Sequence, residues 1–271
     1  MKTFAQKLDH SWSGKKFLSI GLDTDYAKLP ESVKSSKRDE AMFSFNKEII
    51  DATKDLVLGY KIQSAFYEAE GEDGHRAMKK TAEYLNTLPE LVSILDAKRA
   101  DIANTSAAYA KSAFDELGFD AVTIHPYLGR EAVEPFLARA DKGVFVLVRT
   151  SNPGASEFQD LDVEGEPLYK RVAKNVASTW NSNGNVGVVV GATYPNELSE
   201  VRAIVGEMPI LIPGVGTQGG DAGQAYSLGK NQKGAGVIIA AARSIIFASE
   251  KSDFAEAARI SAQKLSEAIL V

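Results

Sequence analysis

The sequence predicts a single (β/α)₈ barrel domain over residues 1–271. Eight short apolar runs, rich in β-branched residues, alternate with eight stretches of helical periodicity along the chain. Runs such as 144–148 and 186–190 are apolar without alternation, which is typical of parallel strands covered on both faces. A doubly wound open sheet is the alternative architecture.

The strands and helices are expected in strict alternation. The expected strands are Phe17–Asp23, Leu56–Ile62, Val92–Lys98, Ala121–Pro126, Val144–Thr150, Val186–Ala192, Pro209–Gly216 and Gly236–Ala241. The expected helices are Asp39–Lys54, Gly74–Asn86, Ile102–Leu117, Arg130–Ala140, Pro167–Trp180, Asn196–Val205, Asp221–Leu228 and Phe254–Leu270. No linker rich in Pro, Gly and Ser divides them. The irregular segments 151–165 and 217–234 both follow strands, so in a barrel they lie over the active-site mouth.

Composition excludes several classes of function. The formal charge of −5 gives no support for binding to nucleic acid or to an anionic membrane. The chain has no cysteine, which excludes disulfides, thiolate catalysis and thiolate metal sites. The first ten residues lack the apolar core of a signal peptide, and no window approaches 18 continuous apolar residues. We therefore expect a soluble cytoplasmic protein.

The most informative motif follows the third expected strand. Asp96 and Lys98 project from the same side of an ideal strand because side chains alternate with period two. Asp101 comes three residues later, where the chain turns into a helix. Two carboxylates bracketing one lysine favour its ammonium form, which suits a proton donor or a cationic anchor better than an amine nucleophile.

Polar residues at the carboxyl ends of barrel strands indicate chemistry. Asp23, Lys61 and Arg243 close the first, second and eighth expected strands. Residues 214–219 match G-x-G-x-x-G but lack the context of a dinucleotide fingerprint. They can instead offer backbone N–H groups to a phosphate, with Arg243 adding a charged fork. The three histidines are scattered, so no metal site is expected, and His125 suits a structural role.

Taken together, these residues resemble orotidine 5′-phosphate decarboxylases, especially the longer bacterial branch of that family. The resemblance covers roughly residues 17–247. It rests on Gly21–Asp23, Lys61–Glu68, Asp96–Thr105, Thr150–Ala155, Pro213–Asp221 and Arg243–Ile245. It implies a cofactor-independent, homodimeric (β/α)₈ enzyme that converts orotidine 5′-monophosphate (OMP) to UMP and CO₂ in pyrimidine biosynthesis.

The resemblance also implies catalytic roles. Lys61, Asp96, Lys98 and Asp101 would form a charged network, with Asp101 and Thr105 serving the neighbouring subunit's site. Asp96 would crowd the substrate carboxylate, and Lys98 would offset charge at C6 and protonate it.

Substrate-binding roles follow from the same resemblance. Asp23 would bind ribose hydroxyls, Ser151 would meet the pyrimidine, Pro213 would line the site, and Gln218 and Arg243 would hold the phosphate. Many members have glycine at positions where this chain has Ala241 and Ala242, which puts backbone phosphate contacts there in doubt.

Three other readings compete with this one. A Schiff-base aldolase needs a neutral lysine, which the flanking carboxylates disfavour. Related barrels share Asp-x-Lys-x-x-Asp but use a metal for aldol or keto-acid chemistry; Lys61 and Thr150–Ala155 argue against them. A non-catalytic nucleotide-binding module would keep the phosphate loop and lose the charged tetrad, which is intact here.

Overall fold

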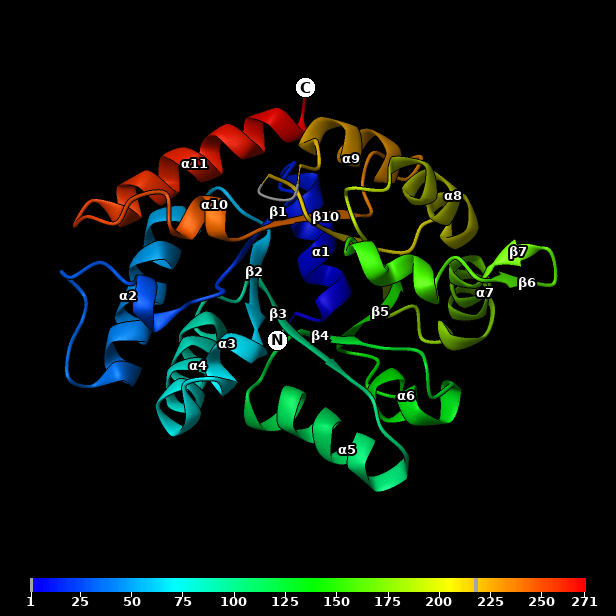
Figure 1. Ribbon diagram of the computed structural model, residues 1–271, viewed down its shortest axis with the longest axis horizontal. Coiled ribbons are helices and arrows are strands. Elements are labelled where there is room, and N and C mark those ends of the chain that lie inside the picture. The colour runs from blue at the N-terminus through cyan, green and yellow to red at the C-terminus, as the bar shows by residue number, and fades with distance from the viewer. Residues whose placement is uncertain (1, 217–218) are drawn as a thin grey trace.

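The strands form the closed barrel that the sequence predicts. The computed structural model describes residues 2–216 and 219–271. Within them, eight parallel strands close in the order β1-β10-β9-β8-β5-β4-β3-β2 (Figure 1). They are β1 Leu18–Gly21, β2 Gly59–Gln63, β3 Val92–Arg99, β4 Ala121–Ile124, β5 Gly143–Arg149, β8 Val186–Val190, β9 Ile210–Pro213 and β10 Val237–Ala241. The open-sheet alternative is therefore wrong.

Helices follow the strands and surround the barrel. The eight predicted ones correspond to α2 Arg38–Thr53, α4 Gly71–Asn86, α5 Ala103–Lys111, α6 Arg130–Leu137, α7 Leu168–Asn175, α8 Pro195–Val205, α9 Ala222–Gly229 and α11 Phe254–Ile269. Two of them continue as π-helical turns over Ser112–Glu116 and Val176–Trp180. No helix in the described part of the chain is long and apolar enough to cross a membrane.

Several short elements were not predicted. They are α1 Phe4–Ser13, α3 Ser64–Glu68, α10 Arg243–Ile246, the 3₁₀ turns Tyr26–Lys28 and Pro153–Glu157, and a hairpin of β6 Asp162–Val163 with β7 Glu166–Pro167. The hairpin projects at the right of Figure 1. Its first strand belongs to the irregular segment 151–165, which we expect over the mouth of the barrel, and β7 continues beyond that segment to Pro167, where the helix was expected to begin.

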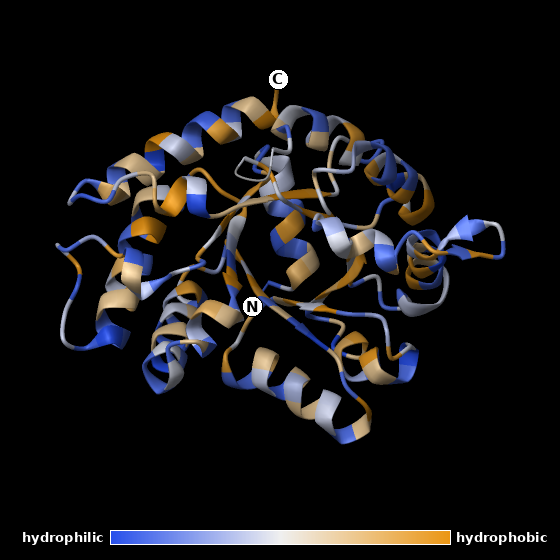
Figure 2. Cartoon of the chain, in the orientation of Figure 1, coloured by the Kyte–Doolittle hydropathy of each residue, from blue (hydrophilic) through white to orange (hydrophobic). Residues whose placement is uncertain are grey.

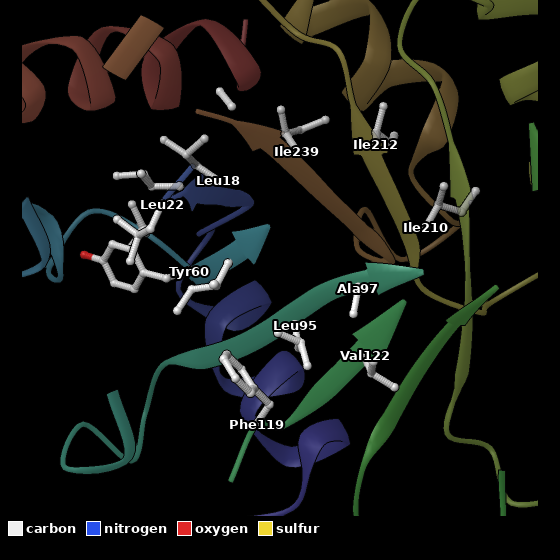
Figure 3. Close-up of a cluster of buried hydrophobic side chains, with 14 of the residues drawn as sticks. Leu18, Leu22, Tyr60, Leu95, Ala97, Phe119, Val122, Ile210, Ile212 and Ile239 are labelled. Atoms are coloured by element: carbon white, nitrogen blue, oxygen red, sulfur yellow. The ribbon is translucent and has the colours of Figure 1, made fainter. Parts of the chain in front are cut away.

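The core has two parts, one on each side of the barrel wall. Alternate strand residues point outward and pack under the helices, such as Tyr60 of β2, Leu95 of β3 and Val122 of β4 (Figure 3). The intervening residues fill the lumen, among them Ile94 and Phe145. The strands are accordingly rich in hydrophobic residues, whereas hydrophilic and hydrophobic residues alternate along the helices (Figure 2). Burial on both faces explains the uninterrupted apolar runs.

Helix α1 fills the amino-terminal end of the barrel, in the middle of the ring of helices (Figure 1). A capping box between Thr3 and Gln6 starts the helix. The ring of Phe4 packs edge-on against Phe145 at 5.7 Å. Lys7 Nζ lies 2.8 Å from the buried Asp120 carboxylate. Helix α1 thus closes the amino-terminal end of the barrel. The open cavity, with its inward-facing charged residues, lies at the carboxyl ends of the strands.

Candidate active site

A cavity of about 390 Å³ opens at the carboxyl ends of the strands. Its wall comes from βα units throughout the barrel, as expected for this fold. Seven residues that the sequence singled out line it: Asp23, Lys61, Asp96, Lys98, Ser151, Pro213 and Arg243. Gln218 lies outside the described residues.

Four charged side chains of the cavity alternate in sign. Lys61 Nζ lies 3.0 Å from Asp96 Oδ2 and 3.6 Å from Asp23 Oδ1. On the other side of the same carboxylate, Lys98 Nζ lies 2.6 Å from Asp96 Oδ1. The side chains of Lys61 and Asp96 are only 7% and 12% exposed, whereas that of Lys98 is 44% exposed. Of the two lysines in this network, Lys98 is therefore the one whose ammonium group faces the open cavity.

Electrostatics keep the buried pair ionised. Burial acts to raise the pKa of Asp96, but the charges and hydrogen bonds of Lys61 and Lys98 outweigh it and hold this pKa well below its usual value. Burial acts to lower the pKa of Lys61, and the Asp96 and Asp23 carboxylates reverse that effect and raise it. The Asp96 carboxylate thus stays negatively charged at neutral pH, between the two lysine side chains.

A bulge in β3 sets the direction of the Lys98 side chain. The pairing of β3 with β4 shifts between Leu95 and Arg99, and Lys98 adopts a left-handed backbone conformation with φ +47°. A left-handed φ is uncommon for residues other than glycine, so this backbone is strained at a lysine. Strain of this kind clusters at functional sites. Asp96 and Lys98 both point into the cavity, as expected from the alternation of an ideal strand. The backbone between them is nevertheless irregular.

The side of the cavity predicted to bind phosphate contains Gly214, Val215, Ala242 and Arg243. Arg243 begins α10, is exposed, and forms no ion pair with any residue that the structure describes. Gly21 is constrained here, because a Cβ at this position would come within 2.6 Å of the Ala242 Cβ. The alanine that departs from the family pattern thus restricts its neighbour in β1 to glycine.

Asp23 offers an unused acceptor to the cavity. Its Oδ1 atom is buried and has no hydrogen-bond partner among the described residues, apart from the Lys61 ammonium at 3.6 Å. A buried carboxylate oxygen normally accepts a hydrogen bond. A ligand hydroxyl at this position would satisfy it.

Ser151 follows a segment that Arg149 and Gln159 hold in place. The Arg149 side chain is 2% exposed, donates to Asp160 at 3.0 Å and stacks over the Tyr194 ring at 3.9 Å. The Gln159 amide accepts from the Thr150 N–H at 2.8 Å and donates to the Thr150 hydroxyl at 2.8 Å. These contacts fix the strand end from which Ser151 lines the cavity.

Asp101 and Thr105 do not line the cavity of their own chain. The Asp101 carboxylate accepts a hydrogen bond from the Ile102 N–H at 2.7 Å, and Thr105 is exposed on α5. The ring of His125 lies 3.2 Å from the Ala100 carbonyl oxygen, in keeping with the expected structural role.

Sequence reasoning assigned no role to four polar residues of the cavity, Gln63, Thr123, Thr150 and Asn152, of which the first two contact Asp96. Gln63 Nε2 donates to Asp96 Oδ2 at 3.2 Å, and Thr123 Oγ1 donates to Asp96 Oδ1 at 2.8 Å. A threonine inside the apolar run 121–124 was the available signal for Thr123. Within the described ranges, no group of three or more His, Asp or Glu side chains could hold a metal ion.

Comparison with known proteins now decides the family. A family model described as orotidine 5'-phosphate decarboxylase / HUMPS family matches residues 17–258. The chain belongs to this family. A curated orotidine 5'-phosphate decarboxylase from Cellvibrio japonicus is 45% identical over 271 residues, covering 99% of this chain and 98% of the relative. One from Janthinobacterium sp. is 47% identical over 270 residues, covering 98% of each.

Solved structures of family members share the fold. The structure of Leishmania donovani OMP decarboxylase superimposes with a TM-score of 0.83 at 32% identity, covering 99% of both chains. The resemblance seen in the sequence motifs is therefore confirmed, and so is the barrel.

Proposed function

We propose that this protein decarboxylates OMP to UMP and CO₂ in pyrimidine biosynthesis. The observation that supports this proposal most is the row of alternating charges from Asp23 through the buried Lys61 and Asp96 to the partly exposed Lys98, in a protein of the decarboxylase family. Curated relatives with this activity in their names align over nearly the whole chain. The function predicted from the sequence is thus confirmed at the level of the family.

The charges suit a reaction in which negative charge moves to carbon. Asp96 would lie near the substrate carboxylate and oppose its negative charge. As the C6–carboxylate bond breaks, the electron pair stays on C6 and CO₂ leaves. The Lys98 ammonium would stabilise that charge and then transfer its proton to C6, after which the amine regains a proton from water. This combines electrostatic preorganisation with general acid catalysis.

Binding would be distributed along the cavity. Asp23 has the free acceptor for a ribose hydroxyl, Ser151 and Pro213 line the region proposed for the pyrimidine, and Arg243 is available for the 5′-phosphate. Gln218, outside the described residues, stays a predicted phosphate ligand. Phosphate binding remote from C6 can supply free energy that is used at the reacting carbon.

We also propose a homodimer with shared active sites. Asp101 and Thr105 lie outside their own cavity, and exposed apolar side chains surround the start of α5. Ile102 is 59% exposed, and Tyr127 and Leu128 are 83% and 44% exposed. Helices α5 and α6 are joined here by the hydrogen bond from the Ala103 N–H to Glu131 at 3.2 Å. Exposed apolar patches of this kind mark interaction surfaces. Cytoplasmic location and a single domain over residues 1–271 stay predictions from the sequence.

The decisive test follows the loss of orotate absorbance when purified protein meets OMP. We expect turnover with OMP and far slower turnover with the nucleoside orotidine, because the nucleoside lacks the phosphate. Activity should survive exhaustive chelation. Activity that disappears on chelation and returns with a divalent cation would favour the metal-dependent relatives, and absence of turnover with OMP would refute the proposal.

A further inference from the structure

Thr123 of β4 lies opposite the bulge that carries Asp96 and Lys98. β3 pairs with β4 at Leu95↔Val122 and again at Arg99↔Ile124. Residues 96–98 of β3 therefore face the single residue Thr123. A bulge redirects side chains and leaves part of the backbone without its regular ladder partners. Something other than the β-ladder must hold this segment.

The Thr123 hydroxyl supplies that support in two directions. Its Oγ1 accepts a hydrogen bond from the Lys98 backbone N–H at 3.0 Å and donates one to Asp96 Oδ1 at 2.8 Å. A hydroxyl has one proton to donate and lone pairs to accept, so one group serves both neighbours. Thr123 is only 1% exposed, so water cannot readily take over either contact.

These contacts close a ring around the two charged residues. The Asp96 oxygen that accepts from Thr123 also accepts from Lys98 Nζ at 2.6 Å. The backbone of Lys98 and the carboxylate that holds its ammonium are therefore tied to the same hydroxyl. Loss of that hydroxyl would release the strained Lys98 peptide, whose φ is +47°, and one orientation constraint on Asp96.

We propose that Thr123 is a positioning residue that sets the placement of the Lys98 ammonium relative to Asp96. It acts through these two residues and has no role in the chemistry of its own. The proposal rests on the proposed decarboxylase function, because the geometry it maintains is that of the proton donor.

Two variants test the role of the hydroxyl. Thr123→Val keeps the branched shape and removes the hydroxyl, and Thr123→Ser keeps the hydroxyl and removes the methyl group. We expect Thr123→Val to lower kcat on the order of 10- to 100-fold, since small misplacements of catalytic groups have effects of this size. KM for OMP should change less than about threefold, because phosphate and ribose contacts remain. Thr123→Ser should keep kcat within about threefold of wild type.

Thr53→Val is the matched control. Thr53 is fully buried, and its hydroxyl donates to the Ile49 carbonyl at 2.7 Å, outside the cavity. It should keep the wild-type kcat, which separates positioning from the general loss of a buried hydroxyl. If Thr123→Val does not fold, Thr123→Ala takes its place with the same expected loss of kcat.

A folded Thr123→Val with kcat within twofold of wild type would overturn the proposal, as would a Thr123→Ser as impaired as the valine variant. Crystal structures of wild type and Thr123→Val give a readout independent of turnover. We expect a rotated Asp96 carboxylate or a changed Lys98 backbone, and unchanged positions of both would also overturn it. Wild-type protein without OMP turnover would instead refute the proposed function, leaving the structural comparison to decide the role of Thr123.

Discussion

Asp96→Asn should destabilise the folded protein at neutral pH. The substitution keeps the shape of the side chain and removes the charge between Lys61 and Lys98. Lys98 can return to water because its side chain is 44% exposed, but the Lys61 side chain is 7% exposed and would keep a buried charge. The cost therefore comes mainly from Lys61.

The distances set the size of the effect. Removing one partner of a buried ion pair costs about 3–5 kcal/mol. Asp23, at 3.6 Å from Lys61 Nζ, still compensates part of that charge after the 3.0 Å contact with Asp96 is lost. We therefore expect a loss near the low end of that range, about 3 kcal/mol in the free energy of unfolding.

The pH dependence gives a second signature. The pKa of Asp96 is lowered in the folded protein, so its contribution to stability is fully present above the unfolded-state pKa of about 4. It is lost as the pH falls towards the folded-state pKa. The difference between wild type and Asp96→Asn should therefore be constant from about pH 8 to pH 5 and should shrink below about pH 4.

Urea unfolding at pH 7, 5 and 3.5 measures both effects. Asp55→Asn is a suitable control, because Asp55 is 59% exposed and pairs with Arg259 at the surface. Breaking that pair should cost less than about 1 kcal/mol. An Asp96→Asn loss no larger than that of the control at pH 7, or a difference that grows as the pH falls, would refute the reasoning.

Three other substitutions address catalysis, binding and assembly. Lys98→Ala should lower kcat at least about 10³-fold, since it removes a general acid and an electrostatic stabiliser together, while UMP binding persists in calorimetry. Arg243→Ala should raise KM for OMP roughly 10- to 100-fold through loss of a charged phosphate contact, with little change for orotidine. Mixing inactive Lys98→Ala and Asp101→Ala should restore up to about one quarter of wild-type activity, because half of randomly assorted dimers are mixed and each holds one intact site.

Each of these results has a clear contrary outcome. A Lys98→Ala variant that keeps a tenth of wild-type turnover would remove Lys98 from the role of proton donor. Equal losses for OMP and orotidine in Arg243→Ala would separate Arg243 from the phosphate. If mass spectrometry confirms subunit exchange and no activity returns, Asp101 acts within its own subunit.

The strands and the Asp96–Lys98 pair could be predicted from local pattern, whereas the larger charged network was expected only from the family resemblance. Strands buried on both faces are uninterrupted apolar runs, and the Asp96–Lys98 motif follows one of them directly. Helix α1 was not predicted, although the Thr3–Gln6 capping box and the four-residue spacing of Phe4 and Leu8 are both helical signals. Its burial depends on the open end of a barrel built by residues far along the chain.

The β3 bulge and the role of Thr123 depend on pairing between strands. An ideal strand would also direct Asp96 and Lys98 to one side, so the sequence alone gives no sign of the irregularity. Thr123 is visible as a polar residue in an apolar run, but its partners follow from the register of β3 against β4. That register is a property of the assembled barrel.

At position 98 the residue that would best stabilise the fold differs from the residue that turnover requires, because the Lys98 backbone is left-handed. Glycine would adopt a φ of +47° without the strain that any side chain brings. Selection for thermal resistance alone would therefore favour glycine at position 98, and selection for turnover would favour the lysine. A library screened only for folded, heat-resistant protein should accumulate inactive barrels with glycine there, so stabilisation of this scaffold requires that turnover be screened in parallel.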